Sequence, residues 1–176
     1  HVKDRIAGAM NPCPCGFKGL PEQKCVSSPS TCGRYASKIS GPLLDRIDLQ
    51  IEVPAVPASD LSLPRSSEDS ATVRARVAAA RDMQRARFAA LGLKGVRTNA
   101  ECAGKALEDI ATPDKPGLDL LQQAADQLCL SARGYHRTLK VARTLADLDG
   151  AEVVGRIHIA EALSYRAEVL RQSRAA

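Results

Sequence analysis

Four cysteines near the start of the chain are the residues with the most recognisable chemistry. They are Cys13, Cys15, Cys25 and Cys32, in the spacing C-x-C-x9-C-x6-C. Four thiolates suit tetrahedral zinc, and a site closed by four cysteines would be structural. Only Pro14 separates the first two ligands, which departs from the common CxxC pair. The pattern favours zinc and leaves open free thiols or a redox pair.

Arg46 is placed where it could act on a phosphate group. It comes at the end of a short helix expected after Ser40, directly before a predicted strand. A rigid junction of this kind can present a guanidinium to a neighbouring subunit. There it would stabilise the charge that builds on the γ-phosphate during phosphoryl transfer. The alternative is an ordinary ion pair with Asp45 or Asp48.

Arg133 is a second candidate for phosphate binding. It lies in the first turn of a helix predicted over residues 132–148, where a cation opposes the helix dipole at a cost of roughly 0.3–1 kcal/mol. Such a placement suggests an anionic partner. The alternative is a solvated basic face that Arg133 shares with Arg137 and Lys140.

Two strands are expected to position the N-terminal candidates. Residues 6–10 read as the end of a short strand, and residues 47–53 alternate apolar and polar side chains with a period of two, as in a half-buried strand. Residues 12–38 are rich in Pro, Gly, Ser and Cys and are expected to form an irregular loop that the cysteines order. The prolines and serines of residues 57–66 predict a linker.

The remainder of the chain is predicted to be helical, over residues 68–91, 100–111, 118–129, 132–148 and 156–171. In the first of these helices, an apolar face runs along Val73, Val77, Ala80, Gln84, Phe88 and Leu91. Five arginines flank that face, at positions 74, 76, 81, 85 and 87. They would either contact DNA phosphates or extend beside the apolar stripe.

The composition limits the possible classes of protein. Apolar residues make up 44% of the 176 residues, enough for a packed core, while aromatic residues make up only 3%, which argues against a platform for stacking bases. The net charge of +5 is compatible with a polyanionic partner. We see no signal peptide or membrane span and expect a cytoplasmic protein with reduced cysteines.

Several runs together resemble the magnesium-chelatase-like family of AAA+ proteins, of the ComM/YifB type. They are Met10-Asn11-Pro12-Cys13-Pro14-Cys15-Gly16, Gly41-Pro42-Leu43-Leu44-Asp45-Arg46-Ile47-Asp48, the stretches 131–137 and 139–148, and the closing run from His158 to Arg166. The resemblance spans most of the chain, and the order of the runs makes it specific.

The resemblance implies a fold and a set of roles. The fold would be mainly α: a C-terminal remnant of the AAA+ α/β core at residues 1–56, with about two strands and the cysteine-rich loop, a linker at 57–66, and an all-helical lid at 67–176. Asn11 would be the sensor-1 residue that orients the attacking water, Arg46 the arginine finger, and Arg133 the sensor-2 arginine at the γ-phosphate. The four cysteines would be the insertion that distinguishes ComM-like proteins.

The resemblance further implies a parent protein that is a homo-hexameric, ATP- and Mg²⁺-dependent motor, which migrates DNA branches during recombination of incoming strands. A motor of the magnesium-chelatase type and a zinc-dependent nucleic-acid-binding module are the alternatives. The sequence contains no G-x-x-x-x-G-K-[ST] P-loop and no strand with a Walker-B acidic pair. We therefore expect those parts upstream, and no ATP hydrolysis by these residues alone.

Overall fold

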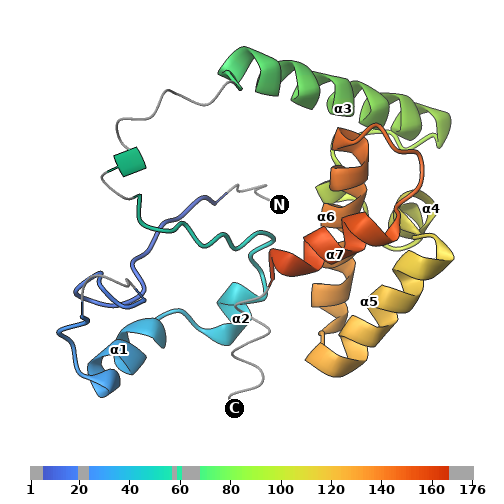
Figure 1. Ribbon diagram of the computed structural model, residues 1–176. Helices are drawn as coiled ribbons and strands as arrows, with labels where there is room; N and C mark the ends of the chain where they lie inside the picture. Colours follow the sequence, from blue (N-terminus) through green and yellow to red (C-terminus); the bar gives the residue numbers. More distant parts are fainter. Residues whose placement is uncertain (1–5, 20–23, 57–58, 61–67, 167–176) are drawn as a thin grey trace.

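The structure, a computed structural model, describes residues 6–19, 24–56, 59–60 and 68–166. Its helices fall into two groups (Figure 1): α1 (Pro29–Ala36) and α2 (Gly41–Leu44) lie among extended segments, and the later helices pack together. The later group comprises α3 (Ser70–Ala90), the 3-10 helix η2 (Asn99–Glu101), α4 (Lys105–Ala111), α5 (Lys115–Leu128), α6 (Ala132–Leu148) and α7 (Arg156–Ser164). The chain is mainly α, as predicted.

Two predictions fall on residues that the structure does not describe. Of the linker expected at 57–66, only residues 59 and 60 belong to the described part, and residues 167–171 of the last predicted helix lie outside it. In the parts that are described, no helix is long and apolar enough to cross a membrane.

Helix α6 is the centre of the helical group, where it contacts α3, η2, α4 and α7. Its buried face carries Leu139, Ala142 and Ala146, as the sequence predicted. Other members of the same core cluster come from the surrounding elements: Phe88, Leu107, Ile110, Leu121, Val154 and Ile159. The core is thus largely aliphatic, in keeping with the low aromatic content.

Side-chain caps explain where three of the helices begin. Oxygens of Asp69, Asp114 and Ser131 accept hydrogen bonds from backbone N–H groups in the first turns of α3, α5 and α6. These groups have no partner within the helix, so each cap stabilises its helix by about 1 kcal/mol. The Asp114 cap and a proline in the first turn start α5 at Lys115, three residues before the predicted boundary.

The two predicted strands are wrong. Residues 6–10 and 47–53 have extended backbone but pair with no strand in the described part of the chain. Leu49, Ile51 and Val53 are exposed, and the N–H of Gln50 donates to the carbonyl of Tyr165 at the end of α7. A strand exists only if a neighbour takes its backbone hydrogen bonds, and the period-two pattern alone does not supply that neighbour.

Three further details differ from the predictions. The cysteine-rich loop contains a helix, α1, which starts at a Ser28 cap and a first-turn proline. The segment predicted as one helix over 100–111 is divided by Gly104, whose φ of 53° is left-handed, into η2 and α4. Val73 and Val77 are exposed, because the N-terminal half of α3 extends past the other helices (Figure 1).

Candidate functional site

The four early cysteines come together in one cluster. A tight turn brings Cys13 and Cys15 to an Sγ–Sγ distance of 3.2 Å, and the Cys25 Sγ lies 3.4 Å from Cys15 and 3.7 Å from Cys13. Helix α1 supplies Cys32, whose Sγ is 3.6 Å from that of Cys25. Residues up to 19 positions apart in the chain therefore place their sulfurs around a common point.

Three of these cysteines are placed to hold a metal ion, and the fourth, Cys15, lies beside two of them. Sulfurs bound to zinc at about 2.3 Å lie about 3.8 Å from one another. The Sγ atoms of Cys13, Cys25 and Cys32 all lie within 4.8 Å of one another, and Cys15 lies against two of them. The backbone N–H of Lys18 also donates to the Cys13 sulfur at 3.3 Å, the kind of outer contact that orients a thiolate ligand.

The thiols of the cluster differ in acidity. Hydrogen bonding from the backbone of Phe17, and then from Cys13, lowers the pKa of Cys15 to about 6. For Cys25, the backbone of Ser27 acts in the lowering direction, but hydrogen bonds with Cys15 and burial raise its pKa to about 12. A site of this kind releases protons when a metal binds, since the ligand form of cysteine is the thiolate.

Asn11 lies beside the cysteine cluster, two residues before Cys13. It is exposed. A Cβ placed on Gly16, in the same turn, would be 3.8 Å from the Asn11 Nδ2 atom, so the amide covers this glycine. The structure thus places the predicted sensor-1 residue at the surface, next to the cysteines.

Arg46 is the second residue after α2, following the C-cap Asp45, and it is exposed. Its Nη1 atom donates to the carbonyl of Pro42 at 2.8 Å, which ties the side chain to the preceding helical turn. The expected alternative partners are occupied by other residues: Asp45 pairs with Arg166, and Asp48 with Arg137. The local ion pair considered for Arg46 is therefore not formed.

Arg133 lines a cleft of about 760 Å³ between the segment 48–51 and helix α6. The cleft is basic on its α6 side and apolar around it; its lining includes Arg133, His136, Arg137, Lys140, Leu49, Ile51, Val141, Leu145 and Leu148. Burial, and then repulsion from Arg137, lowers the pKa of Lys140. Three basic side chains of the lining, those of Arg133, Arg137 and Lys140, face one carboxylate, that of Asp48. This excess of positive charge gives the cleft the character of an anion site.

The structure does not gather all three predicted catalytic residues in this cleft. Arg133 lines it, whereas Asn11 and Arg46 are absent from its lining. Arg46 is nevertheless separated by one residue from Asp48, which does line the cleft. The segment that carries Arg46 and the helix that carries Arg133 are therefore neighbours.

A buried polar network joins the helices of the C-terminal group, and sequence reasoning missed it. Asp147 accepts hydrogen bonds from Gln84, Arg87, Asn99 and Arg143, and its side chain is fully buried, as is that of Arg143. Arg143 also donates to the carbonyls of residues 151 and 152. The sequence gives little signal for it: Arg143 and Asp147 directly follow the buried Ala142 and Ala146, and nothing local shows that they are buried as well.

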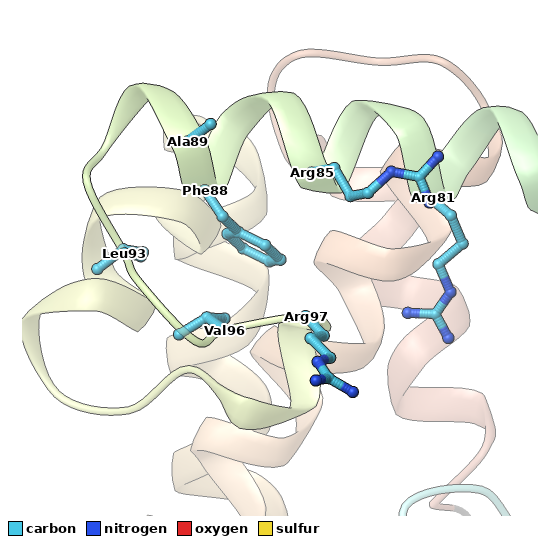
Figure 2. A pocket seen from close by; sticks show the side chains of 7 residues that line it. All are labelled: Arg81, Arg85, Phe88, Ala89, Leu93, Val96 and Arg97. Carbon is cyan, nitrogen blue, oxygen red and sulfur yellow. The ribbon is translucent and has the colours of Figure 1, made fainter.

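The arginines of α3 have different surroundings. Arg87 points inward to Asp147, while Arg81 and Arg85 lie at a second, mainly apolar pocket of about 470 Å³. Figure 2 shows Phe88, Leu93 and Val96 along this pocket, with Arg97 contributed by the segment after α3; the lining also includes Ala89. The Nη1 atom of Arg81 donates to the Gln84 side-chain oxygen at 2.9 Å, and Arg85 forms an ion pair with Asp82. Arg81, Arg85 and Arg97 thus lie around one apolar surface.

Comparison with known proteins gives matches over nearly the whole chain. Residues 67–166 match the family described as magnesium chelatase, subunit ChlI C-terminal, and residues 3–61 match that described as magnesium chelatase, subunit ChlI. The chain is 40% identical over 168 residues to the competence protein ComM of Haemophilus influenzae, a match that covers 94% of this chain and 31% of that protein.

Other relatives are similar to the same extent. An uncharacterized Mycobacterium tuberculosis protein is 40% identical over 158 residues, 90% of this chain and 30% of its own length. An uncharacterized Salmonella typhimurium protein, YifB, is 38% identical over 164 residues, 93% of this chain and 31% of its own length. The chain spans about a third of the length of the curated relatives that it matches.

Proposed function

The chain belongs to the magnesium-chelatase-like ComM/YifB family and carries its C-terminal portion, and on that premise we propose that it is the part of an ATP-driven DNA motor that completes the nucleotide sites between subunits. Residues 1–56 are the end of the AAA+ core, 57–66 the linker and 67–176 the helical lid. The parent is a homo-hexamer that migrates branched DNA.

The exposed guanidinium of Arg46 is the observation that carries this proposal. The two carboxylates next to it in sequence are held by other arginines, and its side chain bonds only the Pro42 carbonyl within the described structure. A cation that is anchored to its own helical turn and free of a counter-charge can reach the nucleotide of a neighbouring subunit. There it stabilises charge on the γ-phosphate oxygens.

Arg133 acts on the same chemistry from the lid. It sits in the first turn of α6, in a cleft that also presents Arg137 and Lys140. A cationic cleft at a helix N-terminus suits phosphate groups. ATP with Mg²⁺ supplies the transferred phosphoryl group; Arg133 binds its terminal phosphate, and Asn11 orients the attacking water.

The cysteine cluster holds zinc and gives the segment around residues 13–32 its fold. The sulfurs of Cys13, Cys25 and Cys32 lie within 4.8 Å of one another, Cys15 adds a fourth sulfur beside two of them, and this segment has little apolar core of its own. A closed site of four cysteine ligands leaves no ligand position for substrate, so its role is structural. Zinc binding then supplies folding free energy that packing does not.

DNA contacts the α3 side of the lid. Arg81, Arg85 and Arg97 edge the pocket of Figure 2, and the chain carries a net charge of +5. Arginines bind phosphates and release counterions, so contact of this kind depends strongly on salt. The apolar side chains of Phe88, Leu93 and Val96 lie between these arginines in the lining of the pocket.

A motor of the magnesium-chelatase type, which drives metal insertion through partner subunits, is the second candidate. The description of the matching family favours it. The cysteine cluster favours the DNA motor, because it is the feature that sets ComM-like sequences apart. DNA dependence of ATP hydrolysis separates the two.

The test uses the full-length parent protein and steady-state ATP hydrolysis, with and without forked DNA. We expect DNA to stimulate hydrolysis, and we expect Arg46→Ala and Arg133→Ala each to abolish most of the activity. An arginine finger is worth about 10³–10⁵ in kcat, so its loss is easily measured. Arg156→Ala, which removes an exposed arginine from the start of α7, is the matched control. Hydrolysis that ignores DNA would favour the chelatase-type motor.

A further inference from the structure

We propose that Arg166 is a positioning residue that clamps the segment around Arg46 and ties it to the first turn of α6, where Arg133 lies; this inference rests on the proposed function. The Arg166 side chain is 1% exposed. Its Nη2 atom donates to the Asp45 carboxylate at 2.8 Å, and its Nη1 atom donates to the carbonyl of Ile47 at 3.3 Å. One guanidinium thus holds the residues on both sides of Arg46.

The lid fixes the same segment at a second point. The N–H of Gln50 donates to the carbonyl of Tyr165 at 2.8 Å, and the Gln50 side-chain amide donates to the carbonyl of Leu44 at 3.3 Å. The end of α7 therefore holds the chain from Leu44 to Gln50. In the absence of a neighbouring strand among the described residues, these contacts give the segment its path.

Asp45 connects the clamp to the helix that carries Arg133. Its second carboxylate oxygen accepts a hydrogen bond from the Ser131 hydroxyl at 3.0 Å. That hydroxyl accepts in turn from the N–H of Gly134 at 2.9 Å, as the N-cap of α6. Arg166, Asp45, Ser131 and the start of α6 thus form one connected hydrogen-bonded unit.

Gly134 leaves the space that this unit needs. A Cβ at this position would lie 3.3 Å from the Arg166 Nη2 atom, 3.3 Å from the Ser131 Oγ atom and 3.4 Å from an Asp45 oxygen. Helix interiors normally favour alanine over glycine. Here a methyl group would press on three members of the clamp at once.

Where the end of α7 meets the segment from Leu44 to Gln50, one hydrogen-bond donor and one acceptor have no partner among the described residues. The Nε atom of Arg166 and the Oε1 atom of Gln50 are both buried and make no hydrogen bond in the described structure. Buried polar groups are nearly always paired, so the contacts among the described residues satisfy this region only in part.

The test compares Arg166→Gln and Gly134→Ala with wild type in the full-length protein. We expect kcat for ATP to fall roughly 10- to 100-fold in each, because a displaced catalytic group loses rate on this scale. The KM for ATP should stay within about threefold, since the Arg166 guanidinium is buried and engaged by Asp45 and Ile47. Arg156→Gln, which removes an exposed charge at the start of α7, away from the clamp at its end, is the control and should leave kcat unchanged.

Mixed oligomers separate positioning of the finger from general damage. Variant subunits are mixed with subunits whose own nucleotide site is inactivated but whose Arg46 and Arg166 are intact. Because the finger acts in the neighbouring site, we expect mixing to restore activity to Arg166→Gln as it does to Arg46→Ala. A defect confined to the variant's own site or fold would not be restored.

Each outcome decides between the clamp and the proposed function. Full activity of both Arg166→Gln and Gly134→Ala overturns the clamp alone. The clamp alone is also overturned if mixing restores activity to Arg46→Ala but not to Arg166→Gln and Gly134→Ala. Full activity of Arg46→Ala overturns the finger assignment, and the clamp with it. Should Arg166→Gln fail to assemble, Gly134→Ala decides, because alanine is compatible with the helix.

Discussion

Replacing Asp147 by Asn tests the buried network that joins the C-terminal helices. All the groups that face the carboxylate are donors: the side-chain amides of Gln84 and Asn99 and the guanidinium groups of Arg87 and Arg143. An asparagine has the same shape but loses the charge, and it directs an NH2 group toward these donors. The Arg143 guanidinium, 1% exposed, is then left without a counter-charge.

The size of the effect follows from this burial. Removing one partner of a buried ion pair costs about 3–5 kcal/mol, since the remaining charge stays desolvated. For a protein of about 150–250 residues, each kcal/mol of lost unfolding free energy lowers the melting temperature by roughly 2–4 °C. The predicted loss is therefore roughly 6–20 °C. Arg87, whose side chain is 19% exposed, can turn to solvent, which favours the lower part of this range.

Thermal unfolding followed by far-ultraviolet circular dichroism measures the loss. Asp82→Asn is the matched control, because Asp82 pairs with Arg85 where both side chains are largely exposed, at 63% and 71%. Exposed pairs contribute little, so this variant should stay within about 1 kcal/mol of wild type. Equal melting temperatures for Asp147→Asn and Asp82→Asn would refute the view that the network holds the helices together.

The remaining predictions concern pH, metal and DNA. Burial acts to raise the pKa of Asp147, but hydrogen bonds from Arg87 and the other donors lower this pKa overall. The ionised carboxylate therefore stabilises the fold fully above the unfolded pKa of about 3.9, and this stabilisation is lost as pH falls through the pKa of Asp147 in the folded protein. The melting-temperature gap between wild type and Asp147→Asn should consequently narrow below about pH 4, and a constant gap would contradict this. Metal analysis of the full-length protein should find about one zinc per chain, lost in Cys13→Ser and kept in Cys129→Ser, whose cysteine is exposed and outside the cluster; equal zinc in both variants would exclude the cysteine site. Arg97→Ala should weaken DNA binding and reduce the slope of log K against log salt by about 1, whereas an unchanged slope would remove Arg97 from the interface.

The sequence predicted the C-terminal helices well because their signals are local. Ser131 marks the start of α6, and the spacing of Leu139, Ala142 and Ala146 defines its buried face. Both features depend only on residues within a few turns. The bounds predicted for this helix, residues 132–148, accordingly agree with those in the structure.

The features that the sequence did not reveal depend on distant partners. The alternation over residues 47–53 indicated a strand, but in this chain the segment meets the end of α7 through the Gln50 N–H. Arg143 and Asp147, four residues apart, look like an exposed helical pair, and only the packing of α3 and η2 against α6 buries them. Pairing between Arg166 and Asp45 spans 121 positions and has no local signal.

The cysteine cluster lies between these extremes. Its four residues are identified from type and spacing, while the helix α1 that positions Cys32 is not, because glycine, proline and serine in the surrounding sequence favour an irregular loop. Arg46 could likewise be predicted only in part. Its role is suggested by the family resemblance, whereas the ion pairs of Asp45 and Asp48 with other arginines are seen only in the structure.

ATP hydrolysis by the full-length parent, measured with and without forked DNA in wild type, Arg46→Ala and the Arg156→Ala control, is the most direct test of the proposed function. The proposal predicts hydrolysis that DNA stimulates, that the control retains and that Arg46→Ala loses by a factor of at least about 10³. Equal, DNA-independent hydrolysis in all three proteins would contradict both the DNA motor and the role of Arg46.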